Sequence, residues 1–195
     1  MRRGSTPQLA AFIALEKISM KVVSTGYFTK MRKMENRVVS LVREKAVPIL
    51  GKHAGKIKKI NIIFCKHQVN WGDGFSWLVQ SDQAIIYIPG NYRSYWRAQW
   101  LAVHELCHIK QILEGRLEIR HILNNDGPER DCDYIWYRKR NGRQLRAHTF
   151  EHDSWWEYRN NKWWKVGMDP PFEADARMTA SKHFSECRTN MAWNR

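Results

Sequence analysis

Apolar residues at helical spacing mark the first long element of the chain, residues 30–50. The apolar positions are separated mainly by three or four residues and are Met31, Met34, Val38, Leu41 and Val42. This spacing places them on one face of a helix, which is typical of a helix that packs on a core. The pattern ends near Pro48 and Gly51, two residue types that commonly close a helix.

Shorter apolar runs follow and favour strands. Residues 58–65 (KKINIIFC) are rich in β-branched side chains, and residues 75–79 and 84–88 have a similar character. The last two runs are joined at Ser81 and Asp82, as expected of a tight turn. Together these segments predict a small, mostly antiparallel sheet.

Residues 95–113 form the most apolar helical segment of the chain, with hydrophobic side chains on most sides. A helix of this kind is buried. His104, Glu105 and His108 are therefore polar groups in an apolar setting, where each requires a partner or a function to offset its desolvation.

The C-terminal half predicts one more helix and a less regular segment. Asp169 is a suitable N-cap, with Pro170 and Pro171 in the first turn of a helix that ends near residue 187. Residues of about 114–168 are basic, rich in Trp and weakly periodic, and we interpret them as an insertion or long loop. Residues 1–29 lack a clear pattern and are expected to be an arm, either mobile or bound to a partner. The remainder, residues 30–195, is expected to be one α+β domain.

The chemistry is concentrated in the motif His104-Glu105-Leu106-Cys107-His108. Residues four apart on a helix point the same way, so the two imidazoles can bind one metal ion. Zinc suits two neutral imidazoles and a third protein ligand, and its remaining position holds a water molecule of lowered pKa. Glu105 would act as the general base that removes a proton from this water as it attacks a peptide carbonyl.

A third metal ligand must come from elsewhere in the chain. His108 is followed by Ile-Lys-Gln-Ile-Leu-Glu, which lacks the further Gly and His of the metzincin pattern. Glu173 is the favoured candidate because the helix dipole stabilises an ionised carboxylate in a first turn. Its neighbours on the same face are small or apolar and would allow close packing on the motif helix. The alternatives that stay open are Asp175, His121, His148 and His152.

The segments HELCHIKQ (104–111) and PPFEADA (170–176) together resemble compact gluzincin-type zinc metallopeptidases, particularly those encoded by tailed bacteriophages. The resemblance covers residues of about 85–177 and is exact only at these two motifs. It implies a minimal zincin-like fold, Glu173 as third ligand, and Asp175 as an acid that supports a ligand or the helix packing. In such folds the strand before the motif helix forms the edge of the cleft, a place that residues 84–88 occupy here; an ordinary internal strand fits them as well.

Charge and composition bear on partners and location. The formal net charge is +14, with basic clusters at residues 52–59 and 138–146, which suits either a polyanion-binding surface or a solvated basic face. No apolar run approaches twenty residues, and the N-terminal segment has no cleavage site of a signal peptide. The four cysteines form no CxxC pair and are expected to be reduced, in a host cytoplasm or a virion if the protein is phage-encoded.

Three functions therefore compete. The first is a zinc-dependent metallopeptidase with a peptide or protein substrate. The second is a nucleic-acid-associated protease that resembles the SprT-like family, which the basic clusters favour. The third is a catalytically silent structural or virion protein that retains a stabilising zinc site.

Overall fold

The computed structural model describes most of the chain and leaves out several short connections. The described residues are 20–26, 32–65, 74–89, 94–121, 132–137, 144–150, 154–159, 162–166 and 171–188. Of the expected arm, residues 1–29, residues 1–19 and 27–29 lie outside this part. The protein is α+β, with a four-stranded and a five-stranded sheet.

The helices and central strands lie where the sequence predicts them. The first part of the chain contains β1 (Lys21–Gly26), α2 (Arg32–Leu50), the 3-10 helix η2 (Gly51–Lys56), β2 (Lys59–Cys65), β3 (Phe75–Gln80), β4 (Gln83–Pro89) and α3 (Tyr95–Leu113). The second part contains β5 (Leu117–His121), β6 (Cys132–Tyr137), β7 (Gln144–Phe150), β8 (Ser154–Arg159), β9 (Lys162–Val166) and α4 (Pro171–Arg188). The predicted helices 30–50 and 95–113 and the C-terminal helix are confirmed as α2, α3 and α4.

The first sheet is mixed, so the prediction of a mostly antiparallel sheet is wrong. Its strand order is β1-β2-β4-β3; β2 runs parallel to β1 and β4, and only β3 is antiparallel to its neighbour β4. β2 is parallel to β4 because β3, which connects them in sequence, lies on the outer side of β4 and not between the two strands. The other parallel pair involves β1, which lies within the predicted arm, residues 1–29. α2 carries the chain back from the end of β1 to the start of β2, and such a crossover makes the two strands parallel.

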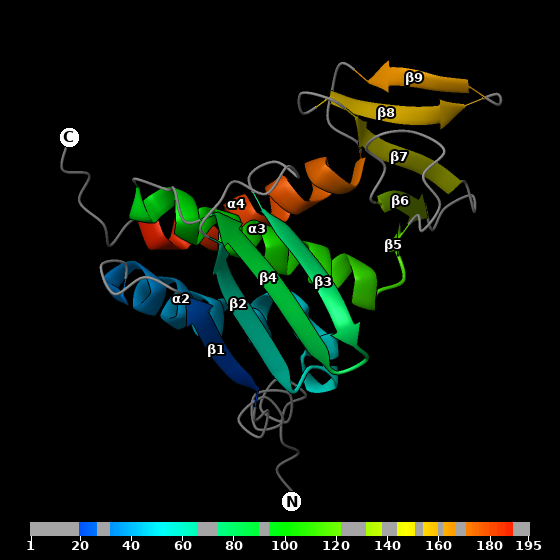
Figure 1. Cartoon of the computed structure of the whole chain (residues 1–195). Helices are drawn as coiled ribbons and strands as arrows, with labels where there is room; N and C mark the ends of the chain where they lie inside the picture. Colours follow the sequence, from blue (N-terminus) through cyan, green and yellow to red (C-terminus); the bar gives the residue numbers. More distant parts are fainter. Residues whose placement is uncertain are drawn as a thin grey trace, which may run out of the picture.

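β4 is an internal strand, so residues 84–88 do not form the edge of a cleft. β4 lies between β2 and β3, and its alternate residues Ala84, Ile86 and Ile88 are buried. The turn at Ser81 and Asp82 folds β3 back along the outer side of β4. β3 is therefore the outermost strand on this side of the described sheet (Figure 1).

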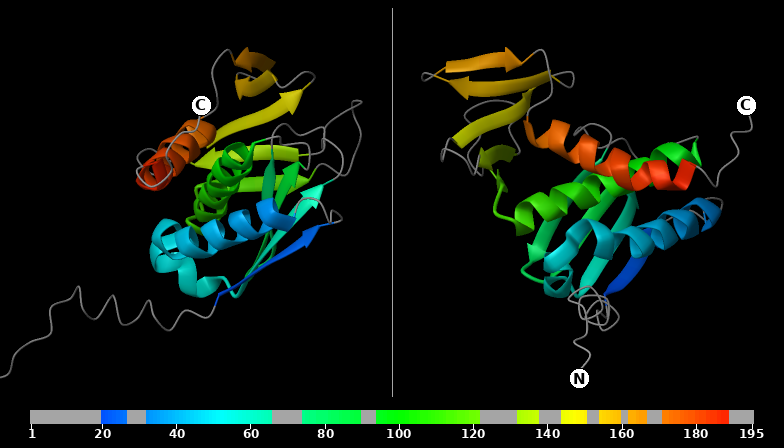
Figure 2. Two further views of the ribbon diagram at one scale, coloured as in Figure 1. Left: turned by 90° about the vertical axis from the view of Figure 1, so that its left-hand side faces the viewer. Right: turned by 180° about the vertical axis from the view of Figure 1, so that it is seen from behind.

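The helices form two layers on one face of the four-stranded sheet (Figure 2). α2 and α3 pack on the sheet, and α4 packs on α3 from the far side. Small residues of α4, Ala176 and Ala180, are fully buried in this contact and allow the two helices to approach closely. None of the helices in the described ranges combines the length and apolar character needed to cross a membrane.

The segment that we interpreted as a long loop contains the second sheet. β5 to β9 pair in sequence order as an antiparallel meander, beyond the C-terminal end of α3 and the N-terminal end of α4 (Figure 1). The two Trp doublets lie in β8 and β9. The sequence hides these strands because a run such as SWWEYR does not alternate between apolar and polar residues.

Candidate metal centre

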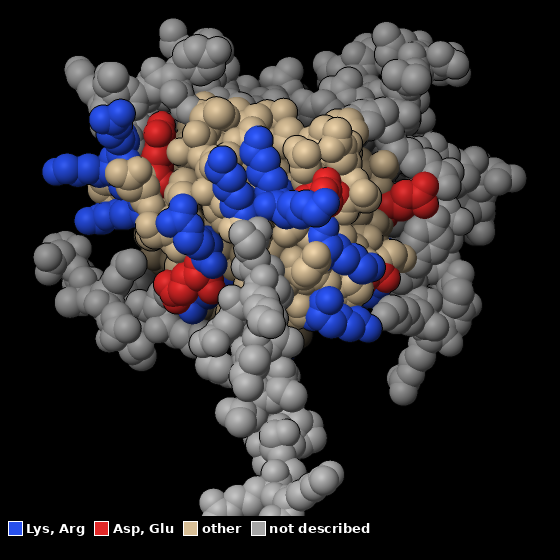
Figure 3. Space-filling model, turned by 90° about the horizontal axis from the view of Figure 1, so that it is seen from below, with Lys and Arg blue, Asp and Glu red and all other residues tan. Residues whose placement is uncertain are grey.

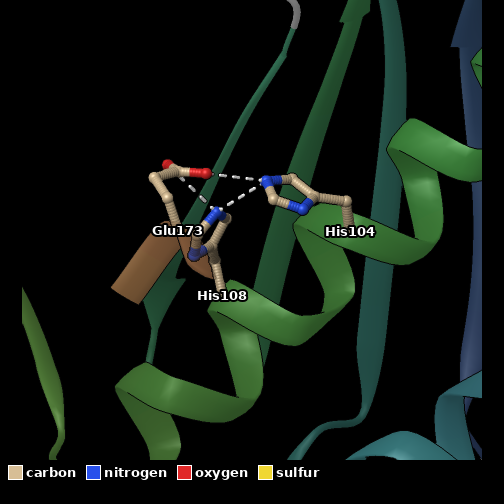
Figure 4. A group of neighbouring side chains, drawn as sticks. All are labelled: His104, His108 and Glu173. Carbon is tan, nitrogen blue, oxygen red and sulfur yellow. Dashed lines mark hydrogen bonds and ion pairs between the residues drawn. The ribbon is translucent and has the colours of Figure 1, made fainter. Parts of the chain in front are cut away.

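Two elements that are distant in sequence supply the side chains of the candidate site. α3 presents His104 and His108 one turn apart, and the first turn of α4 presents Glu173. In Figure 4 both imidazoles and the carboxylate point toward one common position. The two histidines are only 6% and 7% exposed, so the site lies within the packed contact between the two helices.

The separations of these three side chains match a metal-binding geometry. The Nε2 atoms of His104 and His108 are 3.0 Å apart, and Glu173 Oε2 lies 3.0 Å from His104 Nε2. Glu173 Oε1 lies 3.4 Å from His108 Nε2. Donor atoms at about 2.0–2.1 Å from a tetrahedral zinc ion are about 3.3 Å from one another. The three separations in this triangle of side chains are close to that spacing, with Glu173 contacting each histidine through a different carboxylate oxygen.

Electrostatics also favour a cation at this position. Burial alone lowers the pKa of His108, but the carboxylate of Glu173 outweighs it and raises the pKa to about 9. Burial of Glu173 is likewise outweighed by His108 and His104, which hold the pKa of its carboxyl well below the usual range. At neutral pH the metal-free cluster thus keeps a proton, and a metal ion would replace it.

Glu105 lies beside this triangle and has a different environment. It is 4% exposed, and burial raises the pKa of its carboxyl against the opposing effect of His108 and His104. The buried hydroxyl of Ser76 on β3 donates to the backbone carbonyl of Glu105 at 3.0 Å. This bond fixes the motif helix against the outermost strand at the position of the expected general base.

The two imidazoles are held in different ways. The ring of His104 stacks on Trp100, with centroids 5.1 Å apart and planes inclined by 16°. Nδ1 of His104 has no hydrogen-bond partner among the described residues. By contrast, Nδ1 of His108 lies 2.9 Å from Oε1 of the fully buried Gln111.

Of the alternative third ligands, Asp175 is the one whose side chain the structure describes, and it does not join the triangle. Asp175 Oδ2 accepts hydrogen bonds from Gln111 Nε2 at 2.8 Å and Arg116 Nη1 at 3.0 Å, as expected for an acid that supports the helix packing. Among the described side chains the only cluster of this kind is His104, His108 and Glu173. The side chains of His121 and His148, and all of His152, lie outside the described residues.

Two side chains that contribute to the site, Trp100 and Arg116, were not predicted from the sequence. Trp100 precedes His104 by one helical turn, so this spacing could have indicated a ring against the imidazole. Arg116 bonds both Glu114 at 2.6 Å and Asp175 at 3.0 Å. The second bond joins segments far apart in the chain, and no local signal predicts it.

Cys107 lies between the two histidines in the motif but does not join the triangle. Its Sγ donates to the backbone carbonyl of Val103 at 3.2 Å, and burial raises the pKa of the thiol to about 12. A thiol in this state is a poor ligand and a poor nucleophile. The cysteine therefore serves as a small core side chain.

Comparison with known proteins gives no relative for the whole chain. No protein-family model, curated protein or solved structure matches it. The resemblance to gluzincin-type proteins therefore stays a prediction from the two sequence motifs.

Proposed function

We propose that this protein is a zinc-dependent metallopeptidase-type hydrolase of the compact gluzincin kind. One observation carries the proposal: His104, His108 and Glu173 offer one donor atom each, all within 4.8 Å of one another, with Glu105 adjacent in the motif. Two imidazoles and one carboxylate are the ligand set of many hydrolytic zinc sites, which keep a further position for water.

The residues have separate roles in the proposed reaction. A zinc ion held by His104, His108 and Glu173 would supply Lewis-acid polarisation and lower the pKa of water. Glu105 would accept a proton from the water that attacks the peptide carbonyl, and would return it to the leaving amine. The raised pKa of Glu105 suits the first of these steps, because it makes the carboxylate a stronger base toward the attacking water.

β3 is a suitable place for an extended substrate. It is outermost in its sheet and packs beside α3, and its outward side chains Trp77 and Val79 are 36% and 54% exposed. An extended peptide can add to such a strand through backbone hydrogen bonds while its side chains contact the exposed apolar groups.

The direct test combines metal analysis with a hydrolysis assay. Purified protein should contain close to one equivalent of zinc and should cleave an unfolded protein substrate, and the chelated protein should regain activity on zinc addition. Absence of bound zinc at neutral pH would refute the site. Zinc binding without hydrolysis would instead favour the third function, a structural zinc protein.

A second candidate function is a protease that acts in contact with nucleic acid, and a basic surface favours it. The lysines at one end of the four-stranded sheet come from β1, η2 and the start of β2, and we call them the basic end: Lys21, Lys52, Lys56, Lys58 and Lys59. Figure 3 shows Lys and Arg side chains gathered over this end, seen from below. Among the described residues at this end, Asp82 is an acidic partner and lies 2.9 Å from Lys58.

DNA distinguishes the two candidate functions. If the protein acts on nucleic-acid-bound substrates, added DNA should stimulate proteolysis, and the stimulation should disappear as salt rises because phosphate contacts release counterions. If DNA does not change the rate of proteolysis at low salt, the first candidate, a peptidase that acts without nucleic acid, is favoured. The second predicted basic cluster, residues 138–146, lies outside the residues whose side chains the structure describes.

A further inference from the structure

Gln111 is a fully buried amide at the end of the motif helix, and all of its hydrogen-bonding atoms are used. Oε1 lies 2.9 Å from Nδ1 of His108. Nε2 donates to the backbone carbonyl of Phe172 at 2.9 Å and to Oδ2 of Asp175 at 2.8 Å. The side chain therefore bridges one histidine of α3 and the first turn of α4.

The partners of Gln111 determine which way its amide faces. The Phe172 carbonyl and the Asp175 carboxylate are acceptors only, so the NH2 group must face them. A flipped amide would place its oxygen against two other oxygens and lose both bonds. The amide oxygen must then face His108, and this fixes a proton on Nδ1 of the imidazole, because an amide oxygen can only accept.

With its proton fixed on Nδ1, the neutral form of His108 has its lone pair on Nε2, the nitrogen that faces the position between His104 and Glu173. The bridge also continues outward, since Arg116 Nη1 donates to the same Asp175 oxygen at 3.0 Å. Arg116 is held in turn by Glu114 at 2.6 Å. A charged pair at the protein surface thus holds Asp175, Asp175 holds Gln111, and Gln111 holds His108.

We infer that Gln111 is a positioning residue, which orients His108 with Nε2 toward the metal site and ties the turn that carries Glu173 to α3. This inference rests on the proposed zinc site. Partners that hold a ligating histidine typically contribute about 10–100-fold to metal affinity. His104 has no such described partner and is held by the stacked Trp100, so the two histidines should respond differently to loss of a hydrogen bond.

The test compares Gln111→Met with Gln99→Met. Methionine has nearly the shape of glutamine but cannot form the bridge, and Gln99 is a second buried glutamine of α3, 5% exposed. In a chelator competition with Zn²⁺, Gln111→Met should lose about 10–100-fold in affinity, whereas Gln99→Met should keep the wild-type value. Equal zinc affinity in wild type and folded Gln111→Met would overturn the inference and leave the zinc site intact.

A spectroscopic readout separates failure of the inference from failure of the proposed function. In ¹⁵N-labelled protein without metal, the Nδ1 proton of His108 should be hydrogen-bonded and slow to exchange with water, and Gln111→Met should expose it to exchange. The hydrogen bond between Gln111 and His108 does not require zinc. If the wild-type protein binds no Zn²⁺ but its His108 Nδ1 proton exchanges slowly, the metal site is refuted and the bridge is retained. A fast-exchanging Nδ1 proton in wild type refutes the bridge.

A second variant covers the case in which Gln111→Met does not fold. Asp175→Ala removes one acceptor of the Gln111 amide at a side chain that is 38% exposed, so folding should tolerate it. Zinc affinity should fall several-fold and the Nδ1 proton of His108 should exchange faster. Wild-type values for both measurements in Asp175→Ala would contradict the bridge.

Discussion

The Nε2 atoms of His104 and His108 lie 3.0 Å apart, with their ring planes crossing at 89°. Two neutral imidazoles in this arrangement would direct lone pairs toward each other, which is unfavourable unless a proton or a metal ion lies between them. Glu173 closes the same triangle with a negative charge. The cluster is therefore organised around a positive charge, either a proton or a metal ion.

The first prediction concerns the base. Glu105→Gln keeps the size of the side chain and its suitability for a helix, but removes proton transfer, so hydrolysis should fall by about 10²-fold or more. Zinc content and melting temperature should remain close to those of wild type. An unchanged rate of hydrolysis in this variant would show that Glu105 is not the base.

The second prediction concerns metal and stability together. A ligand that binds only the folded state stabilises it by about 2.7 kcal/mol at a hundredfold excess over Kd. Zinc should therefore raise the melting temperature of wild type, and chelation should reverse this. His108→Ala should lose both the zinc and the zinc-dependent increase. A zinc-dependent increase that survives in His108→Ala would place the metal elsewhere.

The third prediction follows from competition between zinc and a proton. Zinc binds the deprotonated imidazole, and the pKa of His108 in the metal-free protein is raised to about 9. Below that pH a proton must leave before zinc binds, so apparent affinity should fall by about tenfold for each pH unit on going down from 9 to 7, and should level off above 9. Zinc buffered by a chelator of known pH dependence allows the measurement. A constant affinity between pH 7 and 9 would contradict the raised pKa.

The fourth prediction concerns the contact between α3 and α4. Ala176 is fully buried one turn after Glu173, so Ala176→Leu should overpack the contact and destabilise the protein by about 1–3 kcal/mol. Zinc affinity should fall as well, because the first turn of α4 carries Glu173. Met178 is 64% exposed on the same helix, and Met178→Leu is the matched control, which should change neither quantity. Normal zinc affinity in Ala176→Leu would mean that Glu173 does not depend on this packing.

The fifth prediction concerns the basic end. The double variant Lys52→Glu, Lys56→Glu reverses two exposed charges of η2 and should weaken binding to a labelled DNA duplex at low salt. A control with the same net charge is Arg32→Glu, Lys33→Glu, at the opposite end of α2. Fluorescence anisotropy of the labelled duplex, measured at increasing salt concentration, compares the two variants. Equal binding by both variants would show that the basic end is not a specific surface for nucleic acid.

The parts of the fold that sequence predicts are those with a strong local signal. The predicted helix 95–113 has the same bounds as α3, Tyr95–Leu113, because the apolar helical pattern is long and continues through the motif. β1 was missed because KVVSTG has little pattern of its own and becomes a strand through parallel pairing with β2, more than thirty residues later. Pairing between strands that are far apart in the chain is a tertiary contact, which the local sequence pattern does not reveal.

The candidate site was also predicted only in part: the sequence indicated the ligands but not how they are held. The spacing of His104 and His108 predicted two of the three side chains that the structure brings together, and a first-turn position made Glu173 the favoured third ligand among five candidates. The orientation of His108 was not predictable, because it depends on Gln111, whose amide is fixed by Phe172 and Asp175 across the contact between helices. The role of Asp175 likewise depends on Arg116, which lies beyond the end of α3.

The separation in sequence between the ligands has a consequence for how the protein tolerates change. His104 and Glu173 are 69 residues apart, and the whole β5–β9 sheet lies between them in the chain. A metal ion bound by both would act as a cross-link that closes this loop, and the entropy of closing a flexible loop rises only with the logarithm of its length, by about 0.6 kcal/mol for each doubling. The β5–β9 segment could accordingly be lengthened, or exchanged for a different domain, at little thermodynamic cost to the metal site.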